Sequence, residues 1–342
     1  MRSRKRFLLG LLCLSIFFGS ASTSQAKSVY AIIKHSDSTI AAYDIQGDQI
    51  EYQTDTQLDF GSGAVSLALD PNSATLFTTY DGANYIGLIN AKTMIAEDDT
   101  VSAPSELAGM AFGEVDSNQR LLAVGRETTK LFVYIYNSSS KTLTLDGGVH
   151  KTLNGLGDNG AFGIALDEQE QILYVTDKTN KVKCYDATGD FAYVEDVTIE
   201  VDGQDRPAVG IAVYNDGQGN RYLYTGAWSH NVSHNYLVRT YLNAPNAIFG
   251  QVEKYLGTNA TSIAVDQATG LVYVTTSNGH IEVFDNATFP SDPIYVEDSD
   301  RISHPADICI AGDVGFLPPF EPSKTDNIED CVPPRDGQIT YT

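Results

Sequence analysis

A short pattern that recurs six times along the chain constrains its fold more than any other feature. Each copy has a small or polar residue, then an apolar, a small and an apolar residue, and usually a closing Asp or Gly. The copies are SLALD (66–70), GMAFG (109–113), GIALD (163–167), GIAVY (210–214), SIAVD (262–266) and DICIA (307–311). Their central residues lie 43, 54, 47, 52 and 45 positions apart. This period matches one four-stranded blade of a β-propeller.

The residues that follow each copy predict further strands. A β-branched and aromatic run comes next, as in ILYVTD (172–177), and buried strands have this composition. A third run then often closes on an aromatic residue and Asp, as in KVKCYD (181–186), before a less regular fourth strand. The Asp that ends several first strands suits an Asx turn into the second strand.

The two ends of the chain hold complementary parts of one repeat. The copy at 307–311 has no second and third strands after it, whereas VYAIIK (29–34) and TIAAYD (39–44) match those strands with no first strand before them. We therefore expect the N-terminal strands to complete the last blade, which closes the ring and removes exposed sheet edges. A β-solenoid would need a shorter period, and a β-sandwich would not explain the half-repeats. The predicted fold is all-β, a six-bladed β-propeller.

Two of the repeats also resemble known families. GIALDEQEQILYVTDKTNKVKCYD (163–186) and SIAVDQATGLVYVTTSNGHIEVFD (262–285) are similar to the NHL and YVTN families of β-propeller repeats, which are common in exported bacterial proteins. The resemblance covers residues 28 to about 315. It implies an architecture and says little about activity.

The N-terminus has the pattern of a secretory signal peptide. Four basic residues within the first six precede an apolar run at 7–18, and small residues end at Ala26. The apolar run is shorter than the roughly 20 residues that span a bilayer, and no later segment is apolar enough to do so. We expect an exported protein that is secreted, periplasmic or at the cell surface, with no membrane span.

The charge of the chain excludes some partners. Loss of the leader changes the formal net charge from −22 to about −26. Binding phosphate groups requires clustered Lys or Arg, so nucleic acid and anionic membranes are poor partners.

The C-terminal segment differs from the repeats. A Pro-rich stretch after residue 315 indicates a stiff linker, and DNIEDCVPPRDGQITYT (326–342) resembles the start of the Ig-like conserved-repeat domains of large bacterial surface proteins. We expect a signal peptide at 1–26, a propeller at 27–315, and at 316–342 a linker with the start of an Ig-like domain. That family's early Cys usually pairs with a later one, so the resemblance implies a partner for Cys331 beyond residue 342. Cys184 and Cys309 are then buried and unpaired; a Cys309–Cys331 bridge is the alternative.

Candidate ligand-binding residues gather on one predicted face. In a propeller, the loops from second to third strands and from each fourth strand to the next blade surround one mouth of the channel. Five of the six histidines fall there, and an exposed Trp beside polar groups is a common stacking platform. The candidates are His35, Asp37, Asp81, Arg126, Glu127, Asp177, Trp228, His230, His234, His280 and His304.

Enzyme signatures are missing from the sequence. It contains no GxSxG, HExxH, P-loop or CxxC motif, and the glycines of GDNGAFG (157–163) precede a predicted strand, unlike those of a dinucleotide loop. The sequence predicts a non-catalytic binding or scaffold module, with no assigned cofactor and with a protein, glycan or small-molecule ligand at the loop face. The alternative is a metal-dependent, lactonase-like hydrolase or lyase in which the histidines hold a divalent ion that activates water.

Overall fold

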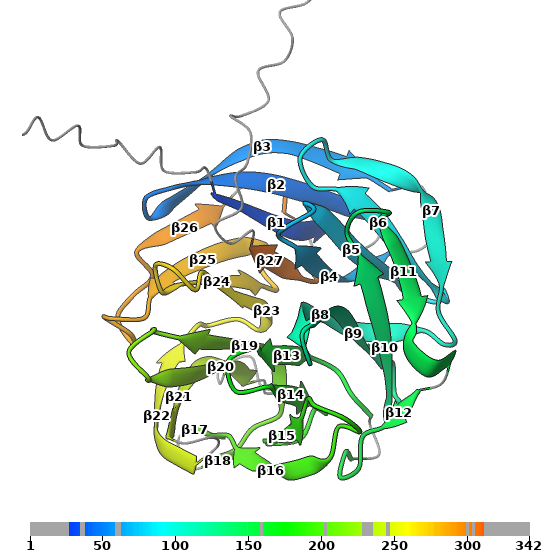
Figure 1. Ribbon diagram of the computed structural model, residues 1–342. Helices are drawn as coiled ribbons and strands as arrows, with labels where there is room; N and C mark the ends of the chain where they lie inside the picture. The colour runs from blue at the N-terminus through cyan, green and yellow to red at the C-terminus, as the bar shows by residue number, and fades with distance from the viewer. Residues whose placement is uncertain are drawn as a thin grey trace, which may run out of the picture.

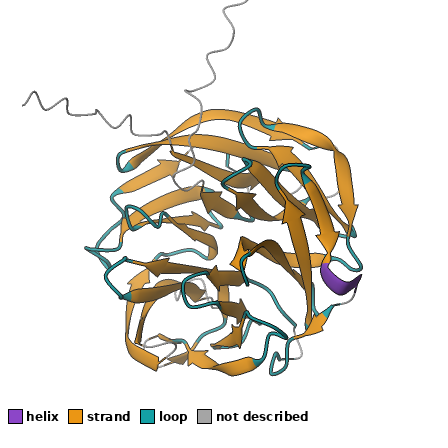
Figure 2. Ribbon diagram, in the orientation of Figure 1, coloured by secondary structure: helices purple, strands orange, loops and turns teal. Residues whose placement is uncertain are grey.

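Six antiparallel sheets surround a common axis in the computed structural model of the protein (Figure 1). Among the described residues, the elements are strands and turns apart from one short 3₁₀ helix at Asp146–Gly148 (Figure 2). The predicted all-β, six-bladed propeller is confirmed. The structure describes residues 27–34, 38–58, 63–148, 150–157, 160–201, 204–227, 235–243, 247–298, 301–302 and 305–310.

Each blade has four strands, numbered here from the axis outwards. The six repeat copies provide the innermost strands, which are β27 (Ile308–Ile310), β4 (Ala64–Asp70), β8 (Leu107–Val115), β13 (Ile164–Asp167), β19 (Ala208–Asn215) and β23 (Ala260–Val265). The second strands are β1 (Lys27–Lys34), β5 (Thr75–Tyr80), β9 (Asn118–Gly125), β14 (Ile172–Thr176), β20 (Arg221–Ala227) and β24 (Leu271–Thr276). The third strands are β2 (Thr39–Gln46), β6 (Tyr85–Asn90), β10 (Lys130–Asn137), β15 (Lys181–Asp186), β21 (Tyr236–Asn243) and β25 (His280–Asp285). The outer strands are β3 (Gln49–Gln57), β7 (Ile95–Ser102), β11 (Thr142–Leu145), β16 (Tyr193–Thr198), β22 (Ala247–Tyr255) and β26 (Tyr295–Asp298).

Three short strands add to this plan. β12 (Lys151–Thr152) pairs with β10, beside β11. β17 (Glu200–Val201) and β18 (Gln204–Asp205) form a hairpin between the fourth and fifth blades, counted from the blade of β1.

The ring closes where the two ends of the chain meet. β27 pairs antiparallel with β1, with Val29 opposite Ile310 and Ala31 opposite Ile308. The blade β27–β1–β2–β3 therefore combines one C-terminal and three N-terminal strands, and the predicted closure is confirmed.

The apolar core lies between neighbouring blades, and it explains the small residues of the repeat. Leu67 packs with Tyr30 and Ile32 of the preceding blade, whereas Ala68, on the other face of β4, packs with Met110 of the following blade. Because the blades converge at the axis, the faces of the innermost strands have the least room. A Cβ atom on Gly163 would lie 2.5 Å from the carbonyl oxygen of Val209 in the next blade.

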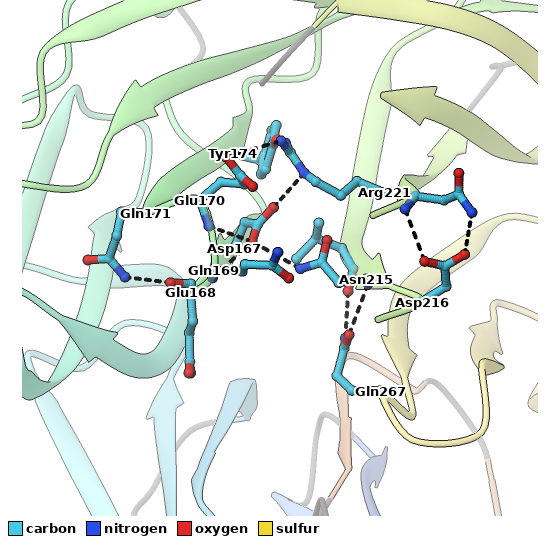
Figure 3. Close-up of polar contacts among 12 residues, drawn as sticks. Asp167, Glu168, Gln169, Glu170, Gln171, Tyr174, Asn215, Asp216, Arg221 and Gln267 are labelled. Carbon is cyan, nitrogen blue, oxygen red and sulfur yellow. Dashed lines mark hydrogen bonds and ion pairs between the residues drawn. The ribbon is translucent and has the colours of Figure 1, made fainter. Parts of the chain in front are cut away.

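The closing Asp of the repeat forms the predicted turn and also joins blades. Asp167 accepts hydrogen bonds of 3.1 Å from the backbone N–H groups of Gln169 and Glu170, which is an Asx turn. Its carboxylate also lies 3.0 Å from Nε of Arg221 in the next blade, and Arg221 donates to the hydroxyl of Tyr174 at 2.7 Å (Figure 3). Arg221 and Asp167 are both buried.

A glutamine holds the backbone of the neighbouring blade close by. Gln267 donates to the carbonyl oxygen of Val213 at 2.7 Å and accepts from the backbone N–H of Asn215 at 3.1 Å (Figure 3). These contacts fix the faces of the blades against each other at the end of the ring opposite the loops between second and third strands.

Several sequence expectations fall outside the described residues. The signal peptide at 1–26 and the segment from 311 onwards, with Cys331, stay predictions. Cys184 is buried, Cys309 is partly buried, and both are free thiols. Among the described residues, no helix is long and apolar enough to cross a membrane.

Candidate ligand-binding site at the channel mouth

A cavity of about 750 Å³ follows the axis between the innermost strands. Each innermost strand is the edge of its sheet, so backbone N–H and C=O groups without a strand partner face the cavity. Apolar side chains from all six strands make up most of the remaining wall. Its volume lies within the roughly 300–1,000 Å³ of typical small-molecule sites, and such sites combine apolar walls with a few polar groups.

A single carboxylate joins three blades on the wall of this channel. Asp307 accepts hydrogen bonds from the hydroxyl of Ser66 at 2.8 Å, from the backbone N–H of Leu67 at 2.7 Å and from the hydroxyl of Ser262. Ser66 in turn accepts from the backbone N–H of Met110 at 3.0 Å. Burial raises the pKa of Asp307 above the ordinary value of aspartate, against these hydrogen bonds.

Charged side chains from two hairpins stand at the rim. Arg126, in the loop between β9 and β10, pairs with Asp81 of the preceding blade and with Glu106 in the loop before β8. The hydrogen bond with Glu106 raises the pKa of the Arg126 guanidinium further. The three side chains are partly exposed, so the cluster adds little stability.

An exposed aromatic ring forms part of the same rim. Phe162 is 38% exposed in the loop before β13, and the ammonium group of Lys178 lies 4.6 Å from the centroid of its ring. Lys178 and Glu127 occupy equivalent positions in successive hairpins, with φ of 60° and 51°. The equivalent residue of the preceding hairpin is Gly82, which takes such a φ without strain. Both charged side chains line the cavity.

An amide on the opposite side of the mouth has spare bonding capacity. The side chain of Asn259 lines the cavity, and its Oδ1 atom is buried with no hydrogen-bond partner among the described residues. A buried acceptor of this kind normally binds water or a ligand. The mouth therefore offers an aromatic face, both signs of charge and an unused acceptor around an apolar channel.

The structure brings together three of the eleven residues predicted from the sequence. Asp81, Arg126 and Glu127 lie at the rim of the cavity. Asp177 is fully buried, and its carboxylate accepts hydrogen bonds from the backbone N–H groups of Gly157 (2.7 Å) and Thr179 (3.1 Å). Six predicted residues lie outside the described part of the chain: His35, Asp37, Trp228, His230, His234 and His304.

His280 is the one histidine of the predicted set that the structure describes. It begins β25, the third strand from the axis, with Nε2 3.3 Å from Asp298 of the neighbouring strand. Within the described residues, no three His, Cys, Asp or Glu side chains are grouped as metal ligands. Because the other four histidines are not described, the metal hypothesis stays a prediction.

Sequence reasoning missed several residues of the mouth. Phe162 lies within GDNGAFG (157–163), a segment that the sequence analysis considered only as a possible dinucleotide loop. Lys178 and Asn259 have no distinctive neighbours in the sequence. Asp307 could have been singled out from the sequence, because it is the one acidic residue at the first position of the six repeat copies.

Comparisons with known proteins show similarity to other structures in the fold alone. No protein-family model matches the sequence, and no curated protein matches it. One similar solved structure comes from a nidogen/laminin complex, with 13% identity and a TM-score of 0.58 over 83% of this chain and 98% of the other. Another is a functionally unknown protein from Desulfotomaculum acetoxidans, with 10% identity and a TM-score of 0.57 over 84% and 89% of the two chains.

A third similar structure is the hydrazine synthase of Kuenenia stuttgartiensis, with 8% identity and a TM-score of 0.52 over 82% and 88% of the chains. At these identities the similarity concerns the fold alone. The protein is a six-bladed β-propeller.

Proposed function

We propose that this protein is an exported, non-catalytic binding module of the NHL/YVTN type, whose ligand covers the loop-face mouth and enters the channel. The observation that carries the proposal is the apolar cavity of about 750 Å³ with Phe162, Lys178 and Arg126 at its rim. The leader supports export, and the Ig-like resemblance of residues 326–342 supports a place in a cell-surface assembly.

The geometry favours a ligand with an apolar group flanked by polar atoms. An aromatic or aliphatic group would enter the channel and stack on Phe162, while polar atoms would meet the Asn259 acceptor and the rim charges. A side chain on a protein loop and a small organic molecule both have this chemistry.

A fragment screen on the chain from Lys27 onwards tests the proposal. Saturation-transfer NMR with a library of aromatic and aliphatic amphiphiles should detect binders whose signals are lost in Phe162→Ala. The matched control is Tyr193→Ala, because Tyr193 is a similarly exposed ring (43%, against 38% for Phe162) on the outer strand β16. Absence of any binder to the wild type, or binders that Phe162→Ala leaves unchanged, would refute the proposal.

A further inference from the structure

The dipeptide Asn-Gly occurs three times in the chain, at 154–155, 159–160 and 278–279. Asparagine deamidates most readily in this dipeptide, because glycine has no side chain to hinder attack by its backbone nitrogen on the preceding side-chain amide. Folding decides which copies can react, since the attacking N–H and the amide must both be free to move. Asn159 lies outside the described residues, so the structure allows Asn154 and Asn278 to be compared.

Asn154 and Gly155 form an exposed turn on the segment that leads from β12 to β13. The chain is anchored on both sides of this turn. Leu153 is buried, and its N–H donates to the carbonyl oxygen of Thr129 at 2.8 Å. Leu156 packs against the apolar core between the third and fourth blades. The turn is therefore an exposed dipeptide between two fixed points.

The reacting groups of this turn are unrestrained. Among the described residues, neither the side-chain amide of Asn154 nor the N–H of Gly155 has a hydrogen-bond partner. The one hydrogen bond of the dipeptide is accepted by the carbonyl oxygen of Asn154, from the hydroxyl of Tyr185 at 2.9 Å. The side-chain amide can therefore turn towards the Gly155 nitrogen without losing a hydrogen bond of its own.

The copy at Asn278 has a similar backbone but is held in place. Gly279 has a φ of 92°, against 87° for Gly155, and its N–H donates to the carbonyl oxygen of Thr276 at 2.9 Å. Oδ1 of Asn278 accepts from the Thr276 hydroxyl at 2.6 Å, and the amide nitrogen lies 3.2 Å from Nδ1 of His280. Both reacting groups are therefore engaged, although Asn278 is exposed as Asn154 is.

We propose that Asn154 is a site of spontaneous deamidation in the folded protein. The backbone nitrogen of Gly155 attacks Cγ of Asn154, the new C–N bond closes a succinimide ring, and the bond from Cγ to the amide nitrogen breaks. That nitrogen leaves as ammonia and takes the proton of the Gly155 N–H. Water then opens the ring at either carbonyl group, which gives aspartate or isoaspartate.

The reaction changes the connection between the third and fourth blades. Both products add a negative charge, and isoaspartate also lengthens the backbone by a methylene group at the carbonyl that accepts from Tyr185. Tyr185 is fully buried, so displacement of this acceptor leaves a buried hydroxyl without its hydrogen bond. The inference concerns the covalent state of the chain and stands independently of the function proposed above.

Peptide mapping of the chain from Lys27 onwards tests this site. The protein is kept at mildly alkaline pH, which favours loss of the N–H proton, and the products are located by tandem mass spectrometry and by enzymatic methylation of isoaspartate. In native buffer, Asn154 should deamidate about tenfold or more faster than Asn278, because the hydrogen bonds around Asn278 must break first. In urea, the two rates should agree within about threefold, because both dipeptides are then unrestrained.

Asn154→Gln is the matched control. Glutamine keeps the amide, but its amide carbon is one bond further from the Gly155 nitrogen, which makes ring closure much slower. The variant should lose the modification at this position, whereas Asn278 should still react in urea. The proposal is overturned if Asn154 deamidates no faster than Asn278 in native buffer, or if it reacts only after urea is added.

Discussion

Asp307 accepts a hydrogen bond of 2.8 Å from the hydroxyl of Ser66, 241 positions away in the sequence. The same carboxylate also accepts from Ser262, so one side chain links the closing blade to both of its neighbours. It stands beside β27, the short strand that completes the ring. The closure of the propeller therefore rests on this polar contact as well as on the pairing of β27 with β1.

Replacement of Asp307 should reveal the strength of this contact and its pH dependence. A folded-state pKa raised by burial means that the stability contributed by Asp307 is complete below the unfolded pKa, near 3.9, and is lost as pH rises through the folded pKa. We expect Asp307→Asn to lower the free energy of unfolding by about 1–3 kcal/mol at the lowest pH of the series. The difference in stability between Asp307→Asn and the wild type should become smaller as pH rises. Urea unfolding across a pH series measures this.

Ser66→Ala is the control for Asp307→Asn. It removes one donor but keeps the carboxyl group, so it should lower stability by about 1 kcal/mol with the pH dependence of the wild type. A difference between the wild type and Asp307→Asn that grows with pH would contradict the assignment.

The left-handed backbone at Lys178 allows stability and binding to be separated. Lys178→Gly removes an unfavourable φ but adds chain entropy to the unfolded state, and these effects of about 1 kcal/mol each should nearly cancel. Fragment binding at the mouth should weaken, because the ammonium group above Phe162 is lost. Lys141→Gly, at another left-handed position in the turn between β10 and β11, is the control and should leave binding intact.

The ion pair between Arg221 and Asp167 should be sensitive to loss of one partner. Arg221→Met leaves a buried carboxylate without its cation, which typically costs about 3–5 kcal/mol. The exposed pair of Lys151 with Asp190 provides a contrast, and Lys151→Met should not shift the midpoint of urea unfolding measurably. Equal effects of the two substitutions would show that the buried pair has no special role.

Two glycines with opposite surroundings test how closely the blades pack. Gly163→Ala places a methyl group 2.5 Å from the Val209 carbonyl oxygen, and such overpacking should cost about 1–3 kcal/mol in thermal unfolding. Gly250→Ala, where the added methyl group meets no atom of the described residues within 4 Å, should change stability by less than about 0.5 kcal/mol. The order of the two effects should reverse if packing at the axis is looser than described.

The two cysteines of the propeller should react slowly with thiol reagents. Burial raises the pKa of Cys184 to about 12 and that of Cys309 well above its ordinary value, so few thiolates exist near neutral pH. In the chain from Lys27 onwards with Cys331→Ser, Ellman's reagent should label both thiols much faster in urea than in buffer. Fast labelling of Cys184 in buffer would contradict the burial of its side chain.

Local patterns carried most of the information about the fold. The period of the repeat, the β-branched and aromatic runs such as ILYVTD (172–177) and the half-repeats at the two ends were enough to predict six blades and their closure, because five blades are each built from contiguous residues and the sixth from the two ends of the chain. The Asx turn at Asp167 was equally predictable, since it involves neighbours two and three positions away.

The candidate site was predictable only in part. Asp81 and Arg126 were placed on the correct face by counting strands, but their ion pair joins two blades and depends on how the blades pack. Phe162 and Lys178 come together for the same reason.

The sequence by itself determined the number of blades, the joining of the chain ends and the end of the ring at which each loop lies. Those properties follow from periodicity, which short-range backbone and side-chain preferences impose. Only the tertiary structure decided that Asp307 links three blades and that Oδ1 of Asn259 has no hydrogen-bond partner among the described residues. These are distances between residues far apart in the sequence, and they are set by the packing of whole blades against one another.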